Sequence, residues 1–342
     1  MKNIPSFLLS FTTLLSLTTG SVMAGQETSK KKFTEPVSGP ELTGPILKPG
    51  LQAPSQIMLK GSNPADLAFG AYQRGYYLTA LKLALPRAES GDPAAQTLIA
   101  ELYWKGLGVG LNQKKATKWY EFAAVGGNRE AQFAYANILL RGNQVPTNKR
   151  LSEKYMREAA NAGHHQAQFN MGQIITAKRP TWQGFKQALP FYQAAAEAGI
   201  PDAQYALANI YSEAKGVRFN DEQKARIWLE RSAQGGFVPA QVDFGIWLAN
   251  GRGGEKNLTQ AREWFYKAAA KGNVIAQNRL ARIYAYGLAV ERDAIKAGAW
   301  HILARRAGFS DSEMDKLFQS LSKIDKKRAL EAANQLTKRV KS

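Results

Sequence analysis

Few residues in this 342-residue chain have the types and spacing that catalysis requires. The chain has no cysteine, which excludes disulfides, thiolate nucleophiles and cysteine-ligated zinc. Its three histidines are His164, His165 and His301, and none has the partner spacing of a metal motif such as H-E-x-x-H. His301 is expected to be a packed or rim residue of a helix.

Other candidate motifs lack the required spacing as well. The run GRGGEKN from Gly251 does not have the G-x-x-x-x-G-K-[ST] spacing of a phosphate-binding loop, and no G-x-S-x-G motif occurs. Carboxylates such as Glu121 and Glu153 are scattered, with no pair suited to acid–base chemistry. The sequence therefore predicts a protein that is not an enzyme and uses no cofactor or metal.

The elements that carry these residues are near-copies of one segment, residues 91–127. The Ala-Gln pairs and the final glycines recur every 36 residues, except for one step of 37 between Gly199 and Gly236. The recurring glycines are Gly91, Gly127, Gly163, Gly199, Gly236, Gly272 and Gly308. Self-similarity at such a period is typical of a solenoid, in which each unit buries its apolar face by stacking on its neighbours.

Each unit contains the pattern of two helices. Apolar residues at three- and four-residue spacing predict a first helix over about 94–104 and a second over about 113–125. Gly106, Gly108 and Gly110 interrupt the chain between them, and Gly127 ends the second helix, where a positive φ favours glycine. The fold class is therefore all-α, an α/α solenoid of stacked helix-turn-helix units.

Two positions of the second helix predict core packing. One position is always aromatic and the position three residues earlier is always small. The aromatic residues are Trp119, Tyr155, Phe191, Trp228, Trp264 and Trp300, and the small ones are Ala116, Ser152, Ala188, Ala225, Ala261 and Ala297. A ring one turn away from a small side chain lets two helices approach closely while the ring fills the space between them. Stacking on bases or sugars is the less favoured interpretation of the aromatic position.

Together, the Ala-Gln pair, the Gly-x-Gly-Val loop and the Ala-x-x-Trp-Tyr second helix resemble the Sel-1-like repeat (SLR) family. This family is a relative of the tetratricopeptide repeats, which have a shorter period of about 34 residues. The resemblance covers residues 92–308 as six repeats. The third unit departs from the pattern in its loop, IITAKRPTWQG, and the fourth carries its extra residue in SEAKGVRF.

The segments before the repeats differ in composition. Residues 1–24 combine Lys2, an apolar run and a small-x-small site ending at Ala24, which predicts a cleaved signal peptide and a periplasmic or secreted protein of bacterial type. Residues 25–62 are rich in lysine and proline and predict a disordered linker, either a spacer or a docking segment.

Shortened units are expected at both ends of the repeats. Residues 63–91 predict a degenerate hairpin that opens at Asn63-Pro64 and contains Pro86 in its second helix. Residues 309–342 predict two capping helices, about 312–323 and 325–338, with Ser310 and Glu313 forming a capping box. A polar terminal cap keeps a solenoid soluble.

The chain is strongly basic, with a formal net charge of +19, of which Lys2 would leave with the signal peptide. Nucleic acid is an unlikely partner for an exported chain. The remaining anionic candidates are an acidic protein, a lipid surface, peptidoglycan or exopolysaccharide. A merely soluble basic surface is an equal alternative.

The surface of the first helices carries the candidate binding residues. Four and seven residues after the residue that precedes each Ala-Gln pair, positions outside the core pattern are mostly polar. We call this set the first-helix stripe: Asn137, Asn170, Gln173, Asn209, Asp243, Arg279 and Arg282. The family resemblance implies that first helices line a concave side. Amides there can bond a peptide main chain and arginines can pair with carboxylates, while a solvated polar face is the alternative.

These features predict a non-enzymatic periplasmic adaptor that binds another protein in envelope signalling, assembly or regulation. The alternative is direct binding of an anionic envelope polymer through the basic surface. The resemblance adds that repeats of this kind are used as extended binding surfaces.

Overall fold

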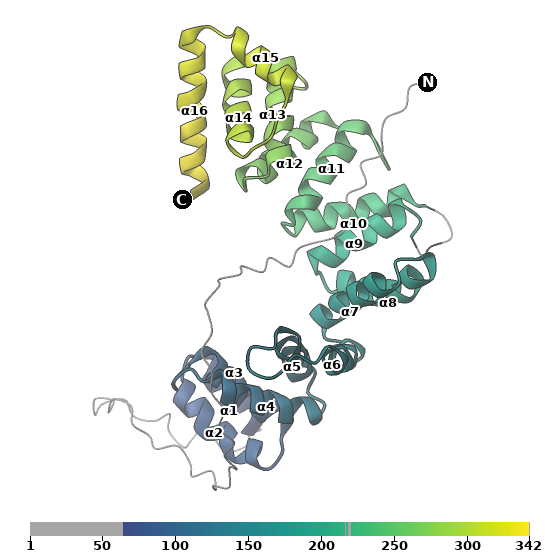
Figure 1. The fold of residues 1–342 in the computed structure, drawn as a ribbon, viewed down its shortest axis with the longest axis vertical. Helices are drawn as coiled ribbons and strands as arrows, with labels where there is room; N and C mark the ends of the chain where they lie inside the picture. Colours follow the sequence, from purple (N-terminus) through teal and green to yellow (C-terminus); the bar gives the residue numbers. More distant parts are fainter. Residues whose placement is uncertain (1–63, 216, 218–219, 342) are drawn as a thin grey trace, which may run out of the picture. The chain divides into compact units, whose positions relative to one another are not determined.

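A computed structural model describes the backbone of residues 64–215, 217 and 220–341 (Figure 1). The predicted signal peptide and linker, and the predicted helix cap at Asn63, lie outside the described residues.

The described residues form sixteen α-helices and no strand. The helices are α1 (Pro64–Gln73), α2 (Tyr77–Glu89), α3 (Pro93–Lys105), α4 (Gln113–Val125), α5 (Arg129–Arg141), α6 (Lys149–Asn161), α7 (His165–Lys178), α8 (Trp182–Glu197), α9 (Pro201–Ser212), α10 (Glu222–Gln234), α11 (Val238–Asn250), α12 (Leu258–Ala270), α13 (Val274–Tyr286), α14 (Ala294–Arg306), α15 (Ser312–Ser320) and α16 (Lys323–Lys341). The predicted all-α fold is confirmed. The predicted first and second helices of the leading repeat correspond to α3 and α4 within one residue at each end.

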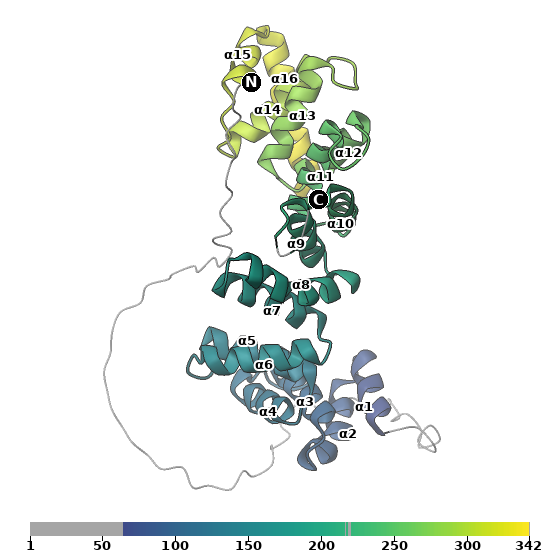
Figure 2. The same ribbon diagram turned by 90° about the vertical axis from the view of Figure 1, so that its right-hand side faces the viewer.

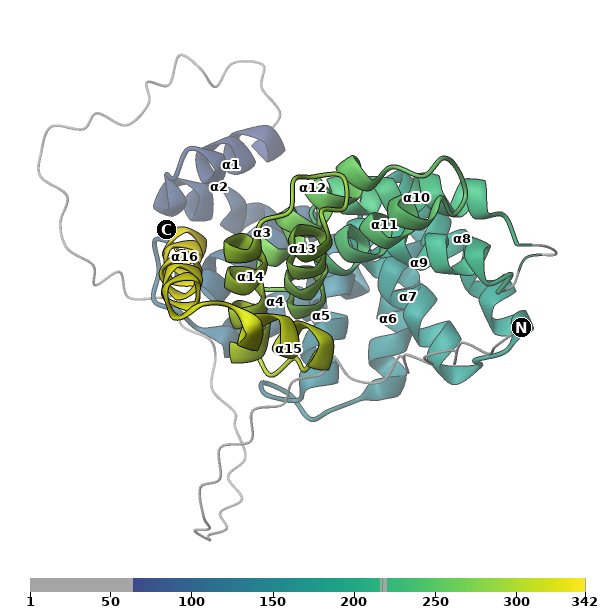
Figure 3. The same ribbon diagram turned by 90° about the horizontal axis from the view of Figure 1, so that it is seen from above.

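Successive helices pack as antiparallel pairs, and each pair packs on the next. Within the repeats the pairs are α3 with α4, α5 with α6, and so on to α13 with α14 (Figure 2). The second helix of each pair contacts the first helix of the following pair, which is the connectivity of a solenoid. At the carboxyl end α16 lies beside α14 (Figure 3).

The recurring glycines end each second helix, as predicted. All seven have positive φ, between 81° for Gly163 and 92° for Gly91. Only glycine adopts this conformation at little cost, and the turn that it makes reverses the chain into the next first helix. Gly108 has a second reason to be glycine, because a Cβ there would lie 2.7 Å from Cβ of Tyr77 in the preceding pair.

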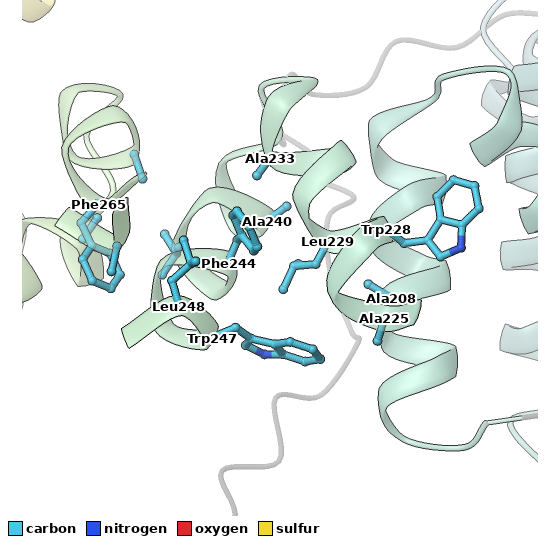
Figure 4. Close-up of a cluster of buried hydrophobic side chains, with 14 of the residues drawn as sticks. Ala208, Ala225, Trp228, Leu229, Ala233, Ala240, Phe244, Trp247, Leu248 and Phe265 are labelled. Carbon is cyan, nitrogen blue, oxygen red and sulfur yellow. The ribbon is translucent and has the colours of Figure 1, made fainter. Parts of the chain in front are cut away.

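The core runs between the helix pairs. Its buried side chains form three clusters in succession along the chain, within residues 68–102, 100–171 and 169–314. Figure 4 shows part of the last cluster, with Leu229 of α10, Phe244 and Leu248 of α11, and Phe265 of α12. The small second-helix position is buried in every unit, as predicted. At the aromatic position Tyr155, Trp228 and Trp300 are buried, and Trp119, Phe191 and Trp264 are half-buried.

The third unit keeps the helix pair but changes the connection. Most second helices begin after an Asn or Asp whose side-chain oxygen accepts a backbone N–H, as Asn148 does from Leu151 at 2.9 Å. In the third unit Thr181 takes this role for Gly184 at 3.4 Å, and α8 is 16 residues long where the second helices of the other repeats have 13. The loop shrinks to residues 179–181, which explains why the loop glycines are missing from the sequence.

The ends differ from the prediction in their bounds and in one cap: α15 ends at Ser320, three residues before the predicted end, and α16 begins at Lys323 and continues to Lys341. Helices α1, α2, α15 and α16 are present, and α2 continues through Pro86 to Glu89. The expected capping box at Ser310 is wrong. Asp311 caps α15 by accepting from the backbone N–H groups of Glu313 and Met314, both at 3.2 Å. Its tertiary contacts, described below, explain why Asp311 rather than Ser310 is chosen.

None of the helices described is both long and apolar enough to span a membrane.

Candidate interaction surface

The first-helix stripe is divided between exposed and half-buried side chains. Gln173 on α7 and Arg279 on α13 are exposed. The half-buried members are Asn137, Asn170, Asn209, Asp243 and Arg282. Only part of each half-buried side chain is therefore available to a partner.

Two stripe amides bond within their own helices. The Nδ2 of Asn137 donates to the carbonyl of Phe133 at 2.9 Å. The Oδ1 of Asn170 accepts from Nε2 of Gln166 at 3.3 Å. Each amide retains further donor or acceptor capacity, because an asparagine side chain has two N–H groups and one oxygen.

Asp243 joins two successive repeats. Its Oδ2 accepts a hydrogen bond from the hydroxyl of Tyr205, at 2.7 Å, across the gap from α9 to α11. Burial raises the pKa of Asp243 above its usual value, and the Tyr205 bond opposes this increase. Asp243 therefore already has a hydrogen-bond partner within the chain, which the spacing pattern alone did not reveal.

Arg282 is held within this chain. Its Nε and Nη2 donate to the two carboxylate oxygens of Asp311 at 2.8 and 2.9 Å, and its Nη1 lies 2.9 Å from Glu313. Asn278, one turn earlier on α13, donates to Asp311 at 2.7 Å. The sequence suggested that Arg282 could pair with a partner's carboxylates; in the structure it pairs with those of the terminal cap.

Asp311 is thus the centre of a small polar network. Its side chain is 8% exposed. Burial alone would raise its pKa, but hydrogen bonds from Arg282, Asn278 and the α15 backbone outweigh burial and hold the pKa well below its ordinary value. The network fixes the start of α15 against α13.

The repeated glutamines, which in the sequence served only to align the units, form a second set of hydrogen bonds. In each repeat the glutamine Nε2 donates to the carbonyl eight residues earlier, near the end of the preceding second helix, at 3.0–3.3 Å. The donors are Gln96, Gln132, Gln168, Gln204, Gln241 and Gln277. These bonds satisfy carbonyls that a helix end leaves free. A glutamine at the same position of every unit is the signal that could have found them.

The three histidines differ in burial. His301 is 3% exposed, as expected for a packed residue, and its Nε2 lies 3.0 Å from Oδ1 of Asp315. His164 caps α7, and His165 beside it is exposed. Within the residues that the structure describes, no group of three or more His, Asp or Glu side chains is placed to hold a metal ion.

Comparison with known sequences identifies the repeat. A sequence model described as Sel1 repeat matches residues 93–128, 129–164, 201–237, 238–273 and 274–309, which is more than half of the chain. The unmatched interval is the third unit, 165–200, where the shortened loop removes the glycines. The six-repeat interpretation therefore combines five matched repeats with one helix pair of altered loop.

Solved structures have the same architecture. A Sel1 repeat protein from Oxalobacter formigenes is 31% identical with a TM-score of 0.59, covering 71% of this chain and 99% of that one. A protective antigen of uropathogenic Escherichia coli with an SLR fold is 26% identical with a TM-score of 0.56, covering 81% of this chain and 68% of that one.

Among characterised proteins, chitin synthase regulatory factor 3 of Schizosaccharomyces pombe is 29% identical over 104 residues. The match spans 30% of this chain but only 11% of the yeast protein. Proteins built from these repeats generally serve as non-catalytic scaffolds for protein–protein interaction, and this chain belongs to the Sel1-repeat family.

Proposed function

We propose that this chain is a non-enzymatic, exported adaptor of the bacterial periplasm that binds another protein in envelope signalling, assembly or regulation. What supports the proposal is the first-helix stripe, whose polar side chains occupy equivalent positions in successive repeats. Gln173 and Arg279 are exposed there, and Asn137 and Asn209 are half-buried. A partner that lies along the stripe would bond several repeats at once.

Export is proposed from residues 1–24, which have the composition of a cleavable signal. Intact-mass measurement on protein from a periplasmic extract should give a chain that begins at Gly25. Protein that retains Met1 and fractionates with the cytoplasm would refute export and leave the scaffold proposal standing.

Partner capture tests the stripe directly. The triple variant Asn137→Ala, Gln173→Ala, Arg279→Ala should recover less of any protein that crosslinks to the unaltered chain in cells. Its matched control carries Lys118→Ala and Gln193→Ala, which alter exposed side chains of second helices. Equal recovery by the triple variant and the unaltered chain would remove the stripe from the proposal.

The net charge of +19 supports a second candidate, binding of an anionic envelope polymer. Attraction to a polyanion through exposed lysine and arginine is screened by salt. Cosedimentation with peptidoglycan or an acidic polysaccharide should then fall steeply between low and high salt, and salt-independent retention would count against this candidate.

A further inference from the structure

A cavity of about 680 Å³ lies on the second-helix side of the last repeats, away from the first-helix stripe. Its walls come from the end of α10, the start of α11, and from α12, α14 and α16. Ligand sites in proteins are typically about 300–1,000 Å³. The size alone therefore permits a ligand, and the lining side chains decide which kind.

Two aromatic rings give the cavity an apolar corner. Tyr266 of α12 and Trp300 of α14 meet edge to face, with ring centroids 5.9 Å apart and an interplanar angle of 84°. Trp300 is 4% exposed and belongs to the core, whereas Tyr266 is 46% exposed. The corner therefore combines the buried ring of Trp300 with the ring of Tyr266, which a ligand can reach.

Two lysines make the same cavity basic. Lys267 holds its Nζ 3.9 Å from the centre of the Trp264 ring. Lys271 donates from Nζ to the carbonyl of Gly236 at 2.9 Å. Both contacts place the ammonium groups at the cavity, and no Asp or Glu of the described chain lines it. The cavity therefore carries positive charge that its own walls do not neutralise.

Gln241 lines the cavity, but its amide serves the packing of the repeats. Gln241 is 4% exposed and uses its Nε2 to bond Ala233. Its Oε1 has no hydrogen-bond partner in the part of the chain described. Gln96, Gln132 and Gln277 share this feature, but Gln241 is the one that lines this cavity. Because these oxygens are covered and recur in four repeats, they belong to the packing between helix pairs and do not face a ligand.

We propose that this cavity binds an acidic peptide segment of a partner protein, in which an aromatic or aliphatic side chain adjoins an Asp or Glu. The apolar side chain would enter the corner of Tyr266 and Trp300. The carboxylate would pair with Lys267 and Lys271. This inference rests on the proposed scaffold function and specifies the chemistry of the partner.

The ring geometry favours a peptide over an acidic polysaccharide. Sugars and bases use open aromatic faces as platforms for stacking. Here the face of Trp264 is already covered by the Lys267 ammonium, and Tyr266 and Trp300 stand nearly perpendicular. An aliphatic or aromatic side chain can enter such a corner edge-on, whereas a sugar ring needs an open aromatic face to stack on.

Selection from a phage-displayed random dodecapeptide library on the full chain tests the proposal. We expect enriched peptides to combine an acidic residue with a neighbouring aromatic or aliphatic one. Calorimetry on the most enriched peptide should show at least about a tenfold loss of affinity for Lys267→Gln/Lys271→Gln, because both charge-assisted bonds to the peptide carboxylate would be lost. Tyr266→Ala should also weaken binding.

Lys114→Gln/Lys118→Gln is the matched control, because this pair is exposed on second helix α4 with the same spacing of four residues. It should keep the affinity of the unaltered chain. All three variants alter exposed side chains, so their melting temperatures should stay close to that of the parent.

Three outcomes would overturn the proposal: no enrichment, enriched peptides without acidic bias, or equal affinity for the Lys267→Gln/Lys271→Gln variant. Tighter, lysine-dependent binding of polygalacturonate than of any peptide would assign the cavity to a polysaccharide and overturn it too. If cellular partners are recovered equally by the lysine variant but lost by the stripe variant, the cavity fails while the scaffold function stands.

Discussion

His164 shows how one side chain can make a repeat junction sensitive to pH. As the cap of α7, its Nδ1 accepts the backbone N–H of Ala167 at 3.1 Å, which requires that nitrogen to be unprotonated. Its ring stacks on Phe133 with centroids 4.2 Å apart, and its Nε2 lies 3.0 Å from Glu130. Burial lowers the pKa of His164, against the opposing attraction of Glu130.

We expect this histidine to reduce stability in mild acid. Because the pKa in the folded state lies below the unfolded value of about 6.5, the unfolded chain binds the proton first as the pH falls. The contribution of His164 to stability is complete above the unfolded value of about 6.5 and is lost as the pH falls through the folded pKa. Asn128 caps α5 with its side chain, so an asparagine at position 164 should keep the cap of α7. His164→Asn should therefore remove this part of the pH dependence, as measured by urea unfolding between pH values of about 5 and 8.

His165→Asn serves as the control, since His165 is exposed and does not cap the helix. The charged neighbours Arg129 and Glu130 are the same in both variants. An unchanged pH profile in His164→Asn, or an equal change in His165→Asn, would show that the cap does not control acid stability.

Arg282 and Arg279 belong to the same stripe but have different roles. Arg282 bonds Asp311 and Glu313, whereas Arg279 is exposed on the same helix. Arg282→Ala leaves the covered Asp311 carboxylate with fewer donors, and should lower the free energy of unfolding by roughly 1–3 kcal/mol. Arg279→Ala should change it by less than about 0.5 kcal/mol. Chemical denaturation measures both, and equal effects would contradict this division.

The helix pairs depend on a match in size between two facing positions. On the first helices of the second to sixth repeats, one position is Ala136, Gly172, Ala208, Gly245 and Ala281 in turn. In the third and fifth repeats this position is glycine and lies close to a ring of the second helix: a Cβ on Gly172 would lie 2.8 Å from Tyr192, and one on Gly245 would lie 2.7 Å from Phe265. In the fourth repeat this position is Ala208, and the second helix carries the smaller Leu229 at the position of the ring.

This match predicts strong coupling between Gly245 and Phe265. Gly245→Ala should destabilise the protein despite the better helix propensity of alanine, about 1 kcal/mol, because the added methyl meets the Phe265 ring. Phe265→Leu alone should destabilise by leaving a cavity. The double variant recreates the Ala208 and Leu229 combination and should be more stable than the sum of the single effects predicts, by at least about 1 kcal/mol. Additive effects in urea unfolding would contradict this.

Most of the helix bounds could be predicted from the sequence, because they depend on residues close together in the chain. The bounds of α3 and α4 follow from apolar spacing and from glycines whose φ must be positive. The choice of Asp311 over Ser310 as a cap could not be predicted, because both residues can cap a helix. What decides between them is contact with Arg282 and Asn278, 29 and 33 residues earlier. Likewise, the role of the Asp243 carboxylate depends on Tyr205 in the previous repeat.

At the scale of the whole molecule, stability depends on contacts between neighbouring pairs. Each pair contacts the next along the chain, so no pair buries its core alone. The last repeat has no following repeat, and α16 takes that place beside α14. The fit is close, because a Cβ on Gly298 of α14 would lie 2.9 Å from Cβ of Ala329 and 3.2 Å from Phe318.

Removal of residues 309–342 should therefore expose the face of α14 that α15 and α16 cover. Truncation after Gly308 uncovers Gly298, takes Asp315 from His301 and takes Asp311 from Arg282. We expect a lower melting temperature and self-association through α14, measured by calorimetry and by light scattering after size exclusion. Arg282→Ala is the comparison, since it loosens α15 but leaves α16 in place, and should lower the melting temperature without causing association. A monomeric truncated chain that melts like the parent would show that the last repeat is stable without its cap, and that repeat contacts alone maintain the fold.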